Sequence, residues 1–239
     1  PGSATALDDV VKAAYDAGIP FVTAAGSVTS PYAINVDSNY GAWGYDMIKA
    51  IAAAKGGKAD ILMVEGIAGH PIVVQEKEGA DRALKEEAGI KVVRIVNGNW
   101  TANVTKSVIL QALATYPGNI DAVWTTGSES RVVAEAFAEA GRPAPLIIGS
   151  VTGDAIGYWK ANPDKYNFTG HGVLPHWTAQ TLYRVGARLL SGQKPKLNTL
   201  LMPIPPIKQE DFEGIYKECM TPDAVSVFPI PATDPVPES

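Results

Sequence analysis

Small polar residues and one tryptophan gather in short glycine-rich stretches of this chain. Trp100 stands in the stretch NGNWTAN, and Thr126 and Ser128 stand in TTGSES. Thr152 belongs to a third such stretch, GSVTGD. Hydroxyl groups form directional hydrogen bonds, and a flat indole ring stacks on a sugar or on another planar face. These residue types are typical of a surface that recognises a small molecule rather than one that reacts with it.

Two histidines belong to comparable stretches. His70 follows the residues EGIAG, and His171 stands in TGHGVLPHW. Each could contact a ligand, although a lone histidine is more often a hydrogen-bonding group with a structural role. His176 comes at the start of an expected helix, where a structural role is favoured.

Motifs that would indicate catalysis are incomplete. The stretch TTGSES lacks the second glycine of the nucleophile elbow G-x-S-x-G, and no histidine is paired with it in the sequence. The residues GIAG fall short of the dinucleotide fingerprint G-x-G-x-x-G. Cys219 and the three histidines do not have the spacing of zinc ligands. We predict no catalytic residue, no metal and no cofactor.

Composition and charge limit the partners. The 239 residues are 46% hydrophobic and carry a formal net charge of −5, without the clustered Lys and Arg that phosphate contacts need. Nucleic acid is therefore not an expected partner. No apolar run approaches the roughly 20 residues of a membrane span, and no signal peptide is seen. The single cysteine, Cys219, has no partner for an internal disulfide.

Helix-like and strand-like patterns alternate along the chain at about 30 residues per unit, which predicts a parallel sheet with helices on both faces. Runs such as ILMV and PLIIG are nearly continuous in apolar residues, as expected for strands buried on both sides. Ligands bind at the carboxyl ends of such strands, where the polar stretches lie. The expected helices cover residues 7–17, 40–55, 71–87, 102–116, 130–140, 154–161 and 178–190; the expected strands cover 19–25, 59–66, 90–96, 120–126, 145–151 and 168–174.

Three further segments carry structural expectations. The opening helix and strand have no strand before them, and we interpret this as a sequence that starts in the middle of a fold. The charged run QEKEGADRALKEE predicts a solvated helix face, and Tyr40, Trp43 and Tyr45 predict helix packing. The proline-dense residues from 201 onward predict an edge strand, an extended segment and a terminal arm.

Four stretches together resemble a known family. They are ALDDVVKAAYDAGIPFVTAA, INVDSNYGAWGYDMIKAI, ADILMVEGIAGHPIVVQEKEGADRAL and NWTANVTKSVILQALATYPGNIDAVWTTGSESRVVAEAFAEAGR. They resemble the type I periplasmic sugar-binding proteins of ABC importers, to which the ribose-binding protein belongs, over the chain to about Gln193. The effector-binding half of LacI-type repressors shares this fold and is similar too.

The resemblance implies an α/β fold of two lobes, each a parallel sheet flanked by helices, with the ligand clamped between them. It implies that the N-terminal part of the first lobe is absent from this chain. Residues 1–36 would be the last unit of that lobe and residues 37–173 the second lobe. Residues 174–202 would return to the first lobe, and residues 203–239 would form a proline-rich hinge and terminal segment.

The resemblance also places the aromatic residue that stacks on a sugar at Trp100. Other positions at which the family carries charged or amide groups hold different residues here: Ala25, Gly26, Val74, Gly127, Ser128, Val151 and Val173. We therefore expect the cleft to offer mainly neutral partners and to favour a solute with fewer hydroxyls than a simple hexose or pentose. The candidate ligand contacts are Trp100, His70, Thr126, Ser128, Thr152, His171, Ala25 and Val151.

The expected function is that of a solute-binding protein of an ABC importer. It would bind a sugar-like or polyol-derived molecule without catalysis and deliver it to the transporter permease, its only contact with the membrane. The periplasm is the expected location. The alternative is the effector-binding domain of a LacI-type transcription regulator.

Overall fold

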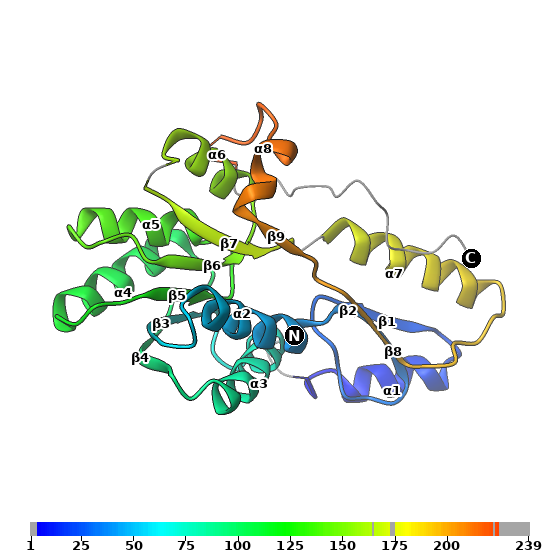
Figure 1. Cartoon of the computed structure of the whole chain (residues 1–239). Helices are drawn as coiled ribbons and strands as arrows, with labels where there is room; N and C mark the ends of the chain where they lie inside the picture. Colours follow the sequence, from blue (N-terminus) through cyan, green and yellow to red (C-terminus); the bar gives the residue numbers. More distant parts are fainter. Residues whose placement is uncertain (1–3, 164, 173–174, 222, 225–239) are drawn as a thin grey trace.

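Two sheets form the framework of the computed structural model, which describes residues 4–163, 165–172, 175–221 and 223–224 (Figure 1). The smaller sheet is parallel and contains β1 (Phe21–Ala24), β2 (Ala33–Ser38) and β8 (Thr199–Met202), in the order β1-β2-β8. Helix α1 (Asp8–Asp16) lies on one side of it and α7 (Pro175–Leu190) on the other (Figure 1).

The larger sheet has the order β4-β3-β5-β6-β7-β9, and all of its pairs are parallel except β7 with β9. Helices α2 and α3 pack on one face, and α4 and α5 cover the other, each with its own buried apolar cluster. The strands are β3 (Ala59–Glu65), β4 (Ile90–Asn97), β5 (Ala122–Thr125), β6 (Leu146–Ser150), β7 (Asn167–His171) and β9 (Pro206–Lys208). The helices are α2 (Tyr40–Ala54), α3 (Pro71–Glu86), α4 (Ala102–Thr115), α5 (Ser130–Glu139), α6 (Gly153–Ala161), the short 3₁₀ turn η1 (Gln209–Asp211) and α8 (Phe212–Ile215).

The predicted α/β class with parallel sheets flanked by helices is confirmed, and the expected helices begin and end within a few residues of the observed ones. Strand β2 was not predicted. Its sequence AINVDS alternates apolar and polar residues, yet every side chain in it is buried. Asn35 accepts a hydrogen bond from the Val28 backbone N–H at 2.9 Å, and Asp37 accepts from the Gly26 N–H at 3.1 Å. These polar side chains hold the loop that follows β1.

The proline-dense residues from 201 onward contain the predicted edge strand, but the extended segment expected after it is wrong at η1 and α8, where burial of Phe212 in the core favours helical turns. β9 begins at Pro206 and pairs antiparallel with β7 at the end of the larger sheet. Proline is tolerated there because an edge strand does not need every N–H for the ladder. The terminal arm expected beyond residue 224 lies outside the described residues.

Helices α2 and α3 touch backbone to backbone at two glycines. A Cβ added to Gly44 would lie 2.0 Å from the Glu76 carbonyl oxygen, and one added to Gly79 would lie 1.9 Å from the Gly41 carbonyl oxygen. Position 76 therefore faces inward, and the prediction of a solvated face over the whole charged run is wrong at Glu76, whose side chain has no exposed surface. The prediction holds for Glu78, which is exposed on the same helix.

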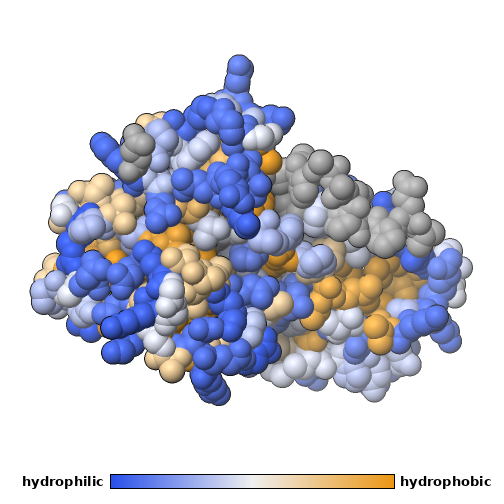
Figure 2. All heavy atoms as spheres, in the orientation of Figure 1, coloured by the Kyte–Doolittle hydropathy of each residue, from blue (hydrophilic) through white to orange (hydrophobic). Residues whose placement is uncertain are grey.

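Apolar side chains are exposed around the smaller sheet. Tyr183 is 78% exposed on α7, and Leu201 is 49% exposed on β8. Figure 2 shows hydrophobic residues gathered over the part of the surface that contains β1, β2 and β8. Among the described residues, no helix has the length and apolar character needed to cross a bilayer.

Candidate functional site

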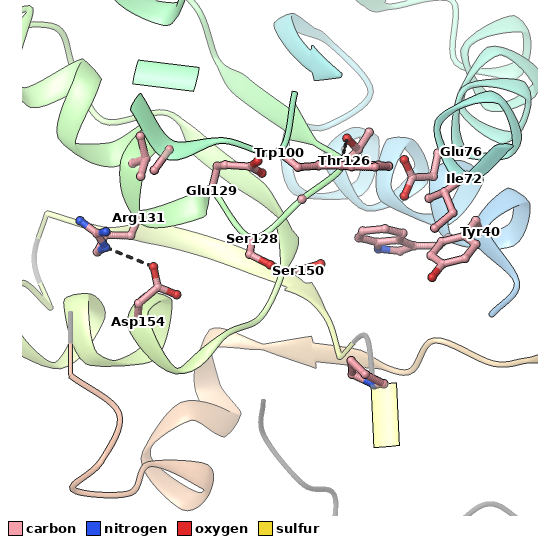
Figure 3. A pocket seen from close by; sticks show the side chains of 15 residues that line it. Tyr40, Ile72, Glu76, Trp100, Thr126, Ser128, Glu129, Arg131, Ser150 and Asp154 are labelled. Carbon is pink, nitrogen blue, oxygen red and sulfur yellow. Dashed lines mark hydrogen bonds and ion pairs between the residues drawn. The ribbon is translucent and has the colours of Figure 1, made fainter. Parts of the chain in front are cut away.

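A cavity of about 340 Å³ opens at the carboxyl ends of β4, β5 and β6 (Figure 3). This is the edge of a parallel sheet at which ligands bind, because the loops that follow the strands converge there. The walls come from α2, α3, the loops after β4 and β5, and the first turns of α5, α6 and α7. The lining residues are Tyr40, Trp43, Ile72, Glu76, Trp100, Ala102, Thr126, Gly127, Ser128, Glu129, Arg131, Val132, Ser150, Asp154 and Pro175.

Trp100 lies in the cavity in a left-handed backbone conformation, with a φ of 53°. Its Nε1–H donates a hydrogen bond to the Thr126 hydroxyl at 3.2 Å. A Cβ on Gly66 would approach the indole to 2.2 Å, and one on Gly127 would approach it to 2.7 Å. A left-handed tryptophan costs about 1 to 3 kcal/mol, so the surrounding loops hold a strained residue in place. Such strain is common where a fold fixes the orientation of a binding side chain.

His70 supports this tryptophan. Its ring meets the Trp100 ring edge to face, with centroids 4.9 Å apart and planes at 81°. Nδ1 accepts a hydrogen bond from the Ile72 N–H at 3.3 Å and so caps α3. Burial lowers the pKa of the imidazole and so favours the neutral ring, in which one nitrogen can accept a hydrogen bond. His70 is not among the lining residues, so its observed contacts position the indole and the helix.

Two carboxyl groups reach the cavity from different elements. Glu129, directly before α5, is 6% exposed, and its burial raises the pKa of the carboxyl to about 7. Glu76 is fully buried, and neither of its carboxyl oxygens has a hydrogen-bond partner within the described ranges. Burial, and then the charge of Glu129, raise the pKa of Glu76 well above its usual range. Figure 3 shows both side chains pointing toward the region of Trp100 and Thr126.

An ion pair forms a further part of the wall. The Arg131 Nε donates to Asp154 at 3.1 Å, and the same guanidinium donates to Glu135 through Nη1 at 2.5 Å. The Thr152 hydroxyl donates to the other oxygen of Asp154. The positive charge of Arg131 is therefore shared between two carboxylates.

The predicted contact residues fall into three groups. Trp100, Thr126 and Ser128 come together in the cavity. His70 and Thr152 lie behind it and hold lining residues. His171 is 5% exposed at the end of β7, where its ring centroid is 6.4 Å from that of Trp43. It does not line the cavity, and its burial lowers the pKa of the imidazole to about 4.

Ala25 and Val151 do not line the cavity. Ala25 is exposed after β1 in a left-handed conformation, with a φ of 53°. The side chain of Val151 has no exposed surface and belongs to the apolar cluster under α4 and α5. Its backbone N–H donates to the His171 carbonyl at 2.9 Å. Val173 lies outside the described residues.

The cavity contains charged side chains that the sequence-based expectation of mainly neutral partners did not include. They are Arg131 and three carboxyl groups, Glu76, Glu129 and Asp154. The sequence did carry a signal for most of them, because Glu129 and Asp154 stand within two of the polar stretches and Arg131 directly follows one of these stretches. Glu76 had no such signal, since it stands among surface charges. Tyr40 and Trp43 pack in the core as predicted and also line the cavity.

Comparison with known proteins identifies the family. Residues 1–194 match the model of the periplasmic binding protein domain. The chain belongs to this family. A xylitol-binding protein from Mycolicibacterium smegmatis is 26% identical over 151 residues, and this match covers 62% of the chain and 43% of that protein's length.

Solved structures of ABC transporter components share the fold. An ABC transporter solute-binding protein from Thermobispora bispora superposes with a TM-score of 0.81 at 26% identity, covering 92% of this chain and 68% of that one. The arabinose-binding component of an ABC transporter from Shewanella sp. ANA-3, bound to L-arabinofuranose, gives a TM-score of 0.80 at 21% identity, covering 89% and 72%. The second likeness is evidence of the fold alone.

Proposed function

We propose that the protein is a solute-binding component of an ABC importer that holds a sugar-like or polyol-derived molecule in this cavity without catalysis. The observation that carries the proposal is the cavity at the strand ends, with the fixed indole of Trp100 beside charged and hydroxyl side chains. An indole face and several hydrogen-bonding groups are what a polyhydroxylated solute requires. A volume of about 340 Å³ is suited to a molecule of monosaccharide size.

Membership of the periplasmic binding protein domain family supports the same function. One relative is named as a xylitol-binding protein, and a neighbour in fold was solved with L-arabinofuranose. The solved structures from Thermobispora bispora and Shewanella sp. ANA-3 are both described as components of ABC transporters, which favours the importer over the LacI-type alternative. The partner would then be the permease of the transporter, and the location the periplasm.

The two sheets correspond to two lobes in this proposal. Residues 37–173 form most of one lobe, residues 1–36 and 174–202 contribute to the other, and the segment from 203 links them again. The cavity fits this division, because Pro175 of α7 joins a wall that otherwise belongs to the larger sheet. Closure of the lobes would complete the enclosure of the solute.

The test is a thermal-shift screen of the full-length protein, followed by calorimetry, with xylitol, L-arabinose, D-allose, D-glucose and myo-inositol as probes. A ligand of the folded state raises the unfolding midpoint by mass action. Trp100→Ala should abolish most of the shift, whereas Tyr183→Ala, which removes an exposed aromatic side chain on α7, should leave it unchanged. Absence of any shift, or an equal shift in Trp100→Ala, would contradict the proposal.

A further inference from the structure

Two of the three buried carboxyl groups that line the cavity, Glu76 and Glu129, lack a cationic partner among the described residues. No Lys, Arg or His in the described ranges forms an ion pair with Glu76 or Glu129, and both oxygens of Glu76 are without hydrogen bonds. Arg131 is the cation that lines this cavity, and it is held by Asp154 and Glu135. Burying a carboxyl group without hydrogen-bond or charge partners costs free energy. Because these two groups lie in the wall of a cavity, a molecule bound in the cavity could supply the missing partners.

The placement of Glu76 is built into the helix pair. Its backbone lies against Gly44, so the side chain cannot turn to solvent without separation of α2 and α3. Glu129 is fixed on the other side, since a Cβ on Gly127 would lie 2.1 Å from its Oε2. The two carboxyl groups thus stay at the cavity wall whether or not a ligand is bound.

Aromatic faces line the same cavity. Trp100, Tyr40 and Trp43 belong to its walls, and the Glu129 carboxyl and the Trp100 ring both approach Gly127. An ammonium group is attracted both by carboxylates and by the faces of aromatic rings. A neutral hydroxyl can donate one hydrogen bond to a carboxylate, but it does not compensate the charge that a buried carboxyl acquires on ionisation. An ammonium group compensates that charge and donates hydrogen bonds as well.

We propose that the solute carries a protonated amino group on a polyhydroxylated skeleton, and that Glu76 and Glu129 bind this ammonium group. The remaining hydroxyls face Ser128, Ser150 and the Arg131–Asp154 pair. The inference rests on the proposed function, because it names the class of solute for the same cavity.

Calorimetry on the full-length protein with matched probes tests the inference. The pairs are xylitol with aminodeoxyxylitol, in which an amino group replaces a terminal hydroxyl, and glucose with glucosamine; N-acetylglucosamine is the uncharged amide control. The aminated member of a pair should bind about tenfold tighter, the ratio expected for one charge-assisted contact. Glu76→Gln and Glu129→Gln should each remove this preference. Glu78→Gln, the same change at an exposed site of α3, should retain it.

The outcomes separate the two proposals. Tight binding of neutral probes with no preference for the amine would overturn the inference and leave the importer function in place. Equal losses for neutral and aminated probes in Glu76→Gln would also overturn it, because the carboxyl would then serve hydroxyls. Failure of every probe to bind would overturn both. Thermal unfolding of each variant shows that it is folded, and two variants at different elements guard against a defect at one of them.

Discussion

Trp100 shows at the scale of one residue how backbone strain and side-chain support combine. The indole is held by the Thr126 hydroxyl, the His70 ring and the glycines at 66 and 127. Trp100→Phe retains an aromatic face but loses the Nε1–H donor, so solute binding should weaken by about 0.5 to 1.5 kcal/mol. Trp100→Ala should lose about 1 to 3 kcal/mol. Calorimetry with the best probe measures both, and equal losses in the two variants would show that the ring face contributes nothing.

Glu129 makes the stability of the protein depend on pH. Its pKa is about 7 in the folded protein against 4.5 as the ordinary value, so the folded state keeps the proton longer than the unfolded state. The stabilising contribution is present below 4.5 and is lost as the pH rises through about 7. Glu129→Gln should therefore be more stable than the parent at pH 8, by about 3 kcal/mol at most, and similar to it at pH 4. Urea unfolding at the two pH values checks this; a constant difference would contradict it.

His171 acts in the opposite direction. Burial lowers the pKa of its imidazole from 6.5 to about 4, so the unfolded state takes up the proton first on acidification. Its contribution to stability is present above 6.5 and is lost as the pH falls toward 4. The difference in the free energy of unfolding between the parent and His171→Gln should therefore increase between pH 4 and pH 6.5, because the other titrating groups are common to both proteins. Urea unfolding at the two pH values measures this difference, and a constant difference would argue against the histidine.

At the scale of elements, the contact between α2 and α3 depends on glycine. Gly79→Ala places a methyl group 1.9 Å from the Gly41 carbonyl oxygen, so the helices must separate. The cost of such overpacking, about 1 to 3 kcal/mol or more, exceeds the gain in helix propensity. Gly186→Ala in α7 is the matched control, because its Cβ meets nothing within 4 Å, and it should stabilise by up to about 1 kcal/mol. Thermal unfolding compares the two, and equal shifts would contradict the prediction.

The sequence predicts these elements better than it predicts the cavity wall. The sequences of β3 and β6 are apolar runs, and amphipathic helices separate such runs along the chain. This regular alternation of strand and helix patterns is enough to indicate a parallel sheet. Strand β2 was not predicted because buried Asn35 and Asp37 interrupt its apolar residues. The burial of Glu76 was not predicted either, because it depends on a tertiary contact with Gly44 of another helix, which leaves no pattern in the local sequence. For Val151, the position after a strand did not distinguish a residue of the apolar core from one that contacts a ligand.

At the scale of the whole molecule, the smaller sheet carries exposed apolar surface on its outer strand. Leu200 and Leu201 of β8 are 37% and 49% exposed, and such surface promotes association between copies. Replacing both with threonine should lower light scattering and dye binding by the chain of 239 residues, since threonine retains β propensity. Affinity for the best probe should not change, because neither leucine lines the cavity. If light scattering is unchanged, association between copies must involve a surface other than these two leucines.

The link between β8 and β9 has a mechanical consequence. Only Pro203, Ile204 and Pro205 separate the end of one sheet from the edge strand of the other. Proline fixes φ at about −65°, so few backbone torsions in this link can change freely and the link is semi-rigid. Ile204 is also anchored against the apolar cluster under α2. A rotation of one sheet relative to the other therefore finds few free torsions in this link, and other segments that join the two sheets must supply most of the change in backbone angles.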